Sequence, residues 1–222
     1  MSDRRLAILG SLAGLSGLVV AMVAVRVVYS GNSNYEALVW NLFLAWIPFG
    51  FALYVYDRYR SGAARTQLLL GGAFWLLFFP NAPYIVTDFK HLRTWTGAPL
   101  WYDVVLVSAG AWAGLVLGFI SLYLMQAVMR RALGALNAWL FVLFALVLSS
   151  FGIYLGRFQR SNSCDIFVRP QAFADDLWTR LADPNESARV VAVTVLFTAF
   201  LAATYLVFYS FARATVREPT EL

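Results

Sequence analysis

Six long apolar segments, separated by short polar ones, dominate the pattern of residues along this chain. A membrane-spanning helix needs about 20 mainly apolar residues. Six segments reach this length, with ends defined to within a few residues: Leu6–Val28, Ala37–Tyr56, Thr66–Val86, Asp103–Val128, Ala132–Leu155 and Ala188–Phe211. The pattern predicts one all-α domain over residues 1–222, built as a polytopic integral membrane bundle of six transmembrane helices.

The first of these segments could be mistaken for a cleaved secretory signal. Its apolar core extends from Leu6 to Val25, whereas the apolar region of a cleaved signal is about 7–15 residues long. No clear cleavage site follows it. We therefore expect this segment to remain as the first membrane span and to act as a signal anchor.

Composition excludes a water-soluble domain. Hydrophobic residues make up 61% of the chain and charged residues 13%, against roughly 25% charged in a typical globular domain. The net charge is +5, but the basic residues occur in pairs and triplets between apolar runs. A nucleic-acid-binding surface would need a basic stripe or patch. The predicted partner is therefore the lipid bilayer, and nucleic acid is excluded.

The basic residues also predict the orientation, because cytoplasmic loops carry an excess of Lys and Arg. If both termini are cytoplasmic, that side holds nine arginines and four acidic residues, and the remaining eight basic and eight acidic residues lie on or near the other side. The nine are Arg4, Arg5, Arg58, Arg60, Arg65, Arg130, Arg131, Arg213 and Arg217. The sequence thus predicts a multi-pass protein of the inner, cytoplasmic membrane.

The third apolar segment is interrupted by prolines. From Thr66 to Phe79 a continuous helix would be about 21 Å long, shorter than the bilayer core of about 30 Å. Pro80 and Pro83 then break the helix, because proline lacks an N–H donor and clashes with the preceding turn. Irregular backbone at membrane depth must be buried in protein or line a wet cavity. We expect a polar cavity near the outer face.

Polar residues follow these prolines at spacings of three and four. Asn81, Tyr84, Thr87, Asp88 and His91 belong to this segment, and the last four share one face if the helix resumes after Pro83. A carboxylate beside an imidazole can transfer protons or bind a cation. Asp88 and His91 are candidate catalytic residues, and Asn81 and Tyr84 are candidate substrate-binding residues. The alternative is an Asp–His pair that only caps a helix end.

The end of the fifth span carries a second polar segment. Arg157 and Arg160 lie about one turn apart and suit a carboxylate or phosphate through bidentate hydrogen bonds. Asn162 is a further candidate for substrate binding, and Asp165 is a candidate catalytic residue that positions one of the others. The alternative is that the arginines pair with Asp88, Asp103 or Asp165 and only hold the loops together.

Other signatures of chemistry are missing. The sequence has no nucleophile elbow, P-loop, dinucleotide fingerprint or zinc-protease helix. His91 is the only histidine and Cys164 the only cysteine, which excludes sites built from several of either. A hard divalent cation held by Asp88, Asp165 and His91 is a minor alternative to a site without a metal. No cofactor is assigned.

Small and polar residues within the spans predict how the helices pack. Three glycine series place small residues on one helix face and favour close helix packing over a permeation path: Gly10 and Gly14; Gly110, Gly114 and Gly118; Gly152 and Gly156. We expect Asn41 to hydrogen-bond to another helix. Pro48 should kink the second span by freeing the carbonyl of Leu44.

Three strings resemble a known family: NLFLAWIPF with Asn41 and Pro48, FFPNAPYIVTDFKHL, and FGIYLGRFQRSNSCDI. They are similar to the bacterial membrane proteins grouped as domain of unknown function 1361, from about the second span through the sixth. Cys164 stands where the family pattern has tryptophan. The resemblance implies a multi-pass bacterial membrane protein and implies no activity.

Three functions remain open from the sequence. The leading one is a site on the extracytoplasmic side that binds an anionic or lipid-linked substrate. This site either only binds the substrate or also catalyses a reaction on it. The second is a small solute transporter or channel component. The third is a non-catalytic scaffold subunit in which the polar residues only brace loops.

Overall fold

The structure is a computed structural model that describes residues 3–93, 97–159, 171 and 183–217. Within these residues the regular elements are helices: α1 (Asp3–Ser30), α2 (Glu36–Arg60), α3 (Arg65–Phe78), α4 (Asn81–Tyr84), the 3-10 helix η1 (Ile85–Arg93), α5 (Leu100–Leu133), α6 (Ala135–Tyr154), the π-helical turn η2 (Leu155–Gln159) and α9 (Pro184–Arg217).

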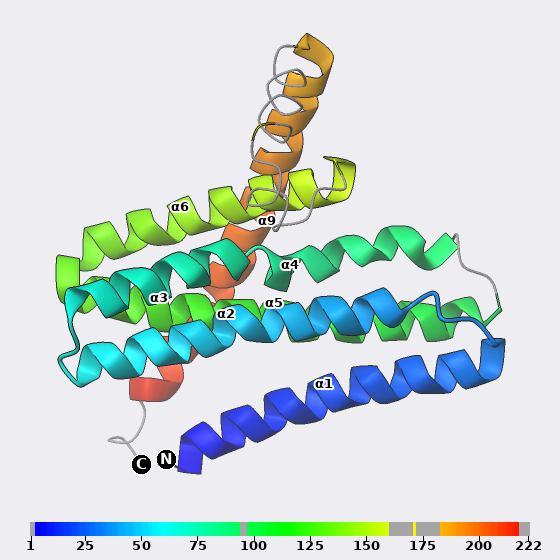
Figure 1. Cartoon of the computed structure of the whole chain (residues 1–222), viewed down its shortest axis with the longest axis horizontal. Coiled ribbons are helices and arrows are strands. Elements are labelled where there is room, and N and C mark those ends of the chain that lie inside the picture. The colour runs from blue at the N-terminus through cyan, green and yellow to red at the C-terminus, as the bar shows by residue number, and fades with distance from the viewer. Residues whose placement is uncertain (1–2, 94–96, 160–170, 172–182, 218–222) are drawn as a thin grey trace.

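These elements form six segments that are long and apolar enough to cross a membrane: Arg5–Ser30, Glu36–Arg60, Arg65–Leu92, Leu100–Leu133, Ala135–Arg157 and Glu186–Ala214. The all-α, six-span prediction is confirmed. Figure 1 shows that the start of α1 and the end of α9 lie at the same end of the bundle. We call this the terminal end, and the opposite one the far end. Which of the two faces the cytoplasm remains a prediction.

The third span is not one regular α-helix. It consists of α3, the single-turn helix α4 and η1, and Figure 1 shows the chain stepping sideways between α3 and α4. The Ala82 amide donates to the Phe79 carbonyl at 3.2 Å. This bond joins residues three apart, whereas an α-helix joins residues four apart. We attribute the step to Pro80 and Pro83, which have no N–H to continue the helical ladder.

Helix α5 packs behind this irregular segment. A Cβ on Gly114 would lie 2.5 Å from the carbonyl oxygen of Ala82, and one on Gly118 would lie 3.1 Å from the Ala82 Cβ. Ala82, Pro83 and Ile85 are buried. The glycines of α5 therefore let the backbone of α4 approach closely, and the close-packing interpretation is confirmed for this series.

The other two glycine series differ in whether another segment packs against them. Gly152 and Gly156 lie against the rings of Pro80 and Tyr84, where added Cβ atoms would be 3.0 Å and 2.9 Å from the nearest ring atoms. Gly10 and Gly14 have no such neighbour within 4 Å in the structure. For the α1 pair, the prediction of close helix packing is wrong, because α1 meets α2 and α5 along a different face.

Burial decreases outward from α5, which contacts α1, α2, α4, η1, α6 and α9. Helices α1 and α9 lie at the periphery and are mostly exposed. Large apolar side chains such as Leu69, Leu136 and Leu196 are more than 60% exposed. Such a surface suits lipid, since soluble monomers rarely expose apolar patches beyond a few hundred Å².

The glycine contacts give a first prediction. We expect Gly114→Ala to destabilise the protein by about 1–3 kcal/mol, the usual penalty of overpacking a core, because the new methyl group would collide with the α4 backbone. Gly14→Ala is the matched control, since it has open space and alanine favours a helix by about 1 kcal/mol. Thermal unfolding in detergent measures both, and equal stability of the two variants would contradict the packing.

Candidate functional site

A buried ion pair joins the two polar segments. Asp88 of η1 and Arg157 of η2 meet at the far end of the bundle, with Nη2 of Arg157 3.2 Å from Oδ1 of Asp88. Both side chains are 10% exposed. Two segments 69 residues apart in sequence thus share one site. Of the three acids considered as partners of Arg157, Asp88 forms the ion pair, Asp103 does not, and Asp165 lies outside the described residues.

The Arg157 guanidinium makes further contacts with the third span. It donates to the Thr87 carbonyl oxygen, and its Nη1 lies 3.4 Å from Nε2 of His91. Its centre lies 5.4 Å from the centroid of the Tyr84 ring, within cation–π distance. All four residues of the predicted polar face therefore surround one arginine.

The 3-10 winding of η1 explains this convergence. With three residues per turn, positions i and i+3 are aligned along the helix, so Asp88 and His91 project on one side. On the η2 side, the Tyr84 ring packs directly against Gly156, where a Cβ would be too close to the ring. The Tyr84 hydroxyl donates to the Gly156 carbonyl at 3.3 Å. The absence of a Cβ at Gly156 thus brings η2 against the third span.

Two asparagines take different places. The Asn41 amide of α2 donates to Oδ2 of Asp88 at 3.1 Å, which confirms the expected hydrogen bond to another helix. The Asn81 amide donates to the Phe78 carbonyl at 3.0 Å, so this contact covers the open end of α3. Asn41 belongs to the Asp88–Arg157 cluster, whereas Asn81 bonds within its own span.

The remaining predicted residues, Arg160, Asn162 and Asp165, lie outside the described residues, as does Cys164. Within the described ranges, His, Cys, Asp and Glu side chains form no group of three that could hold a metal ion. The divalent-cation alternative required Asp165 as its third ligand, so it stays an untested prediction.

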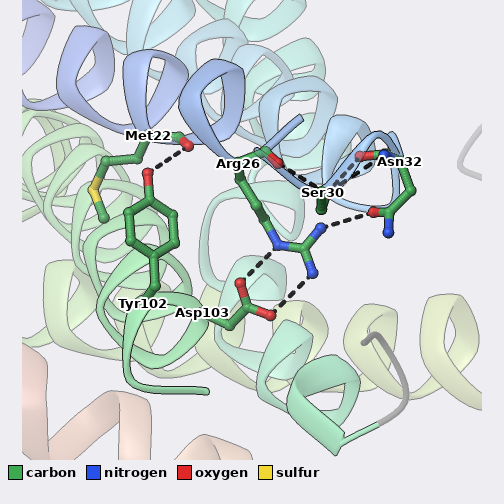
Figure 2. Close-up of polar contacts among 6 residues, drawn as sticks. All are labelled: Met22, Arg26, Ser30, Asn32, Tyr102 and Asp103. Carbon is green, nitrogen blue, oxygen red and sulfur yellow. Dashed lines mark hydrogen bonds and ion pairs between the residues drawn. The ribbon is translucent and has the colours of Figure 1, made fainter. Parts of the chain in front are cut away.

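A second buried ion pair lies at the same end of the bundle and was not predicted. Nε and Nη2 of Arg26 in α1 donate to the two carboxylate oxygens of Asp103 in α5, at 2.7 Å and 3.1 Å. Both side chains are almost completely buried. Figure 2 shows the Asn32 side chain completing the guanidinium's bonds, at 2.9 Å, beside the Tyr102 hydroxyl, which donates to the Met22 carbonyl.

Tyr35 packs against the Arg26–Asp103 pair. Its ring packs 4.4 Å from the Arg26 guanidinium carbon. Burial raises the pKa of Tyr35 to about 12, and the negative charges of Asp103 and, more weakly, Asp88 act in the same direction. The hydroxyl is therefore neutral at physiological pH, and it lies within electrostatic reach of both carboxylates. The two pairs form one polar layer.

This layer defines what chemistry the far end can perform. Asp88 and Arg157 compensate each other's charge, and the same is true of Asp103 and Arg26. Nε of Arg157 is buried without a hydrogen-bond partner among the described residues. The Asp88–Arg157 pair thus keeps an unused donor, whereas in the second pair Nε and both terminal nitrogens of Arg26 are bonded. A ligand oxygen could therefore accept a hydrogen bond from Nε of Arg157.

Comparison with known protein families identifies a match to this chain. A family model described as "Protein of unknown function (DUF1361)" matches residues 40–204. The chain belongs to this family. No curated protein and no solved structure matches the chain.

The DUF1361 match covers part of the polar layer. Asn41, Asp88, Asp103 and Arg157 lie inside the matched residues 40–204, whereas Arg26 lies before them. The Arg26–Asp103 pair therefore connects the first span, which is outside the matched region, to the central helix of the family domain.

Arg26 was missed although the sequence contains a signal for it. An arginine inside an apolar span is rare and needs an internal partner, and Arg26 lies within the predicted first span. Asp103 was considered only as a partner of Arg157 or Arg160, and that pairing with Arg157 is wrong. Because α1 and α5 are far apart in sequence, no local pattern indicates that Asp103 is the partner of Arg26.

The second pair yields a stability prediction. Removing one partner of a buried ion pair costs about 3–5 kcal/mol, because the other charge is left uncompensated. We expect Arg26→Met and Asp103→Leu each to have this effect and to loosen α1 from α5. The double variant should lose less than the sum of the two. Thermal unfolding measures stability, and cross-linking by a short bismaleimide between cysteines introduced at Met22 and Tyr102 in a Cys164→Ser background measures docking, since the Tyr102 side chain bridges the gap between the two backbones. Additive losses would contradict a direct pair.

The orientation has its own test. Cys164 is the only cysteine and belongs to the connection between the fifth and sixth spans. An impermeant maleimide should label it in intact cells or right-side-out vesicles if the far end is extracytoplasmic. Labelling that appears only after permeabilisation would reverse the orientation.

Proposed function

We propose that the far end of this multi-pass membrane protein is an extracytoplasmic site for an anionic or lipid-linked substrate, in the cell membrane. The observation that carries the proposal is the meeting of Arg157 with Asp88 and His91 in a buried cluster built by two spans. A buried arginine is a strong ligand for phosphate or carboxylate because its fork forms two parallel hydrogen bonds.

The proposal assigns a role to each residue. Arg157 binds the anion, and Arg160, Asn162, Asn81 and Tyr84 contribute to its recognition. Asp88 and His91 handle protons, with Asp165 positioning one of them. Asp88 also competes with the ligand for Arg157, since both offer oxygen acceptors to the same guanidinium. Ligand entry is therefore easiest when Asp88 is neutral.

A second candidate, the non-catalytic scaffold, rests on a specific observation. The Arg157 guanidinium is already engaged by the Asp88 carboxylate, the Thr87 carbonyl and His91. In this function the cluster braces η1 against η2, and no ligand enters. The transporter has less support, because the described buried polar side chains toward the terminal end are uncharged: Ser121 and Gln126.

The two candidates predict different effects of Asp88→Asn on ligand binding. If the site binds an anion, this variant removes the competing carboxylate and raises the affinity for dihexanoyl phosphatidic acid, whereas Arg157→Gln lowers it about tenfold or more. The latter magnitude follows from hydrogen bonds to a charged group, each worth about 1.5–3 kcal/mol. Isothermal titration of the purified protein measures both.

In the scaffold function both variants only lose stability, with no change in binding. Asp88→Asn/Arg157→Gln should then lose less stability than the sum of the single variants, as expected for a brace. A host with a deletion phenotype adds a second readout. Loss of the phenotype at normal membrane abundance of either variant would exclude the scaffold.

A further inference from the structure

A second group of basic and aromatic residues lies at the opposite, terminal end of the bundle. Helix α9 packs mainly on α6 and only slightly on α5. An open cavity of about 330 Å³ lies on its last turns and is lined by four residues of that helix: Tyr209, Ser210, Arg213 and Ala214. Sites for small ligands usually have volumes of about 300–1,000 Å³. The cavity is large enough for a head group.

The tyrosine of this cavity is held by its neighbours. The Tyr209 ring makes an edge contact with Trp139 of α6 at 4.9 Å between centroids, and the Arg213 guanidinium lies 5.6 Å from the same ring. The Tyr209 hydroxyl accepts a hydrogen bond from Nη1 of Arg130 in α5 at 3.3 Å. Three helices thus fix the position of one phenol and two guanidinium groups.

The hydrogen-bond balance of this cluster suits an anion. The Ser210 hydroxyl donates to the Leu206 carbonyl of its own helix, so it offers only acceptor capacity. Tyr209 accepts from Arg130 and keeps its own hydrogen to donate. Neither Arg130 nor Arg213 forms an ion pair with an acidic residue in the described ranges, in contrast to Arg5, which pairs with Asp57 at the same end.

The depth of the cavity indicates the kind of anion. Tyr209 and Arg213 lie in the last turns of the span Glu186–Ala214, and Arg130 lies in the last turn of the span Leu100–Leu133. These positions correspond to the head-group layer, where arginine and aromatic residues gather. Basic residues at this depth attract anionic phospholipid head groups.

We propose that Arg130, Tyr209 and Arg213 form a binding site for the phosphate of an anionic phospholipid in the leaflet at the terminal end. The two guanidinium groups hold the phosphate oxygens, the Tyr209 hydroxyl donates a third hydrogen bond, and the acyl chains lie along the exposed apolar face of α9. This site is separate from the Arg157 cluster and does not depend on the function proposed for it.

The experiment compares lipid retention in matched variants. The full chain is reconstituted in nanodiscs of equal phosphatidylglycerol and phosphatidylcholine, extracted with mild detergent, and analysed by native mass spectrometry for both retained lipids. Arg130→Gln/Arg213→Gln removes the proposed site. Arg58→Gln/Arg60→Gln is the control, because these arginines also stack on tyrosine rings near the same end, at 5.4 Å and 5.9 Å, and line no described cavity.

We expect the wild type to retain phosphatidylglycerol preferentially. The site variant should lower this preference at least fivefold more than the control variant. Both variants lose the diffuse attraction of two arginines, and the excess comes from hydrogen bonds to a charged phosphate, each worth about tenfold or more. Tyr209→Phe and Arg213→Lys keep the ring or the charge, and each should give an intermediate preference. Asp88→Asn and Arg157→Gln should leave the preference unchanged.

Three results would overturn the proposal. Equal losses in the site and control variants would mean diffuse attraction of anionic lipid to any surface arginine. Unchanged preference in Tyr209→Phe and Arg213→Lys, both folded by thermal unfolding, would exclude the bonds described. Full displacement of phosphatidylglycerol by millimolar inorganic phosphate would mean that the cavity takes a free anion rather than a lipid.

Discussion

Charges and irregular backbone inside a bilayer must find their partners within the protein, because lipid offers neither water nor counter-ions. In this chain the far end of the bundle depends on that constraint. Arg26 is paired with Asp103, Arg157 is paired with Asp88, and the interrupted third span is covered by α5. Each of these solutions joins segments from different parts of the chain, so the polar layer also holds the helices in their arrangement.

Two ion pairs in one layer have different consequences. Arg26 uses Nε and both terminal nitrogens within the protein, and it fastens a peripheral helix whose glycine face meets no neighbour. Arg157 keeps a buried donor without a described partner and lies next to a histidine. A closed pair is suited to structure, whereas an incompletely satisfied one is suited to exchange its partner for a ligand. This contrast is the basis for placing the proposed function at Asp88 and Arg157.

The arginines at the two ends of the bundle also differ in a way that composition does not reveal. At the terminal end Tyr209 and Arg213 line an open cavity, and Arg130 donates a hydrogen bond to the Tyr209 hydroxyl. At the far end the described buried arginines are paired with carboxylates. The charges of Arg130 and Arg213 are therefore not balanced by an acidic residue in the described ranges, whereas those of Arg26 and Arg157 are. The positive-inside rule counts both kinds of arginine alike, and their surroundings separate them.

Local patterns in the sequence were enough to determine the six spans, the irregularity after Phe79 and the polar faces at 84–91 and at Arg157, because length, hydropathy and proline chemistry act within a segment. They also identified Asn41 as a residue that bonds another helix. Tertiary structure decided the partners. It assigned Asp88 rather than Asp103 to Arg157, gave Asp103 to an arginine in the first span, and left Gly10 and Gly14 unpacked while Gly114 touches a backbone. Such choices depend on how helices far apart in sequence rotate and approach, and hydropathy along a single segment carries no information about that.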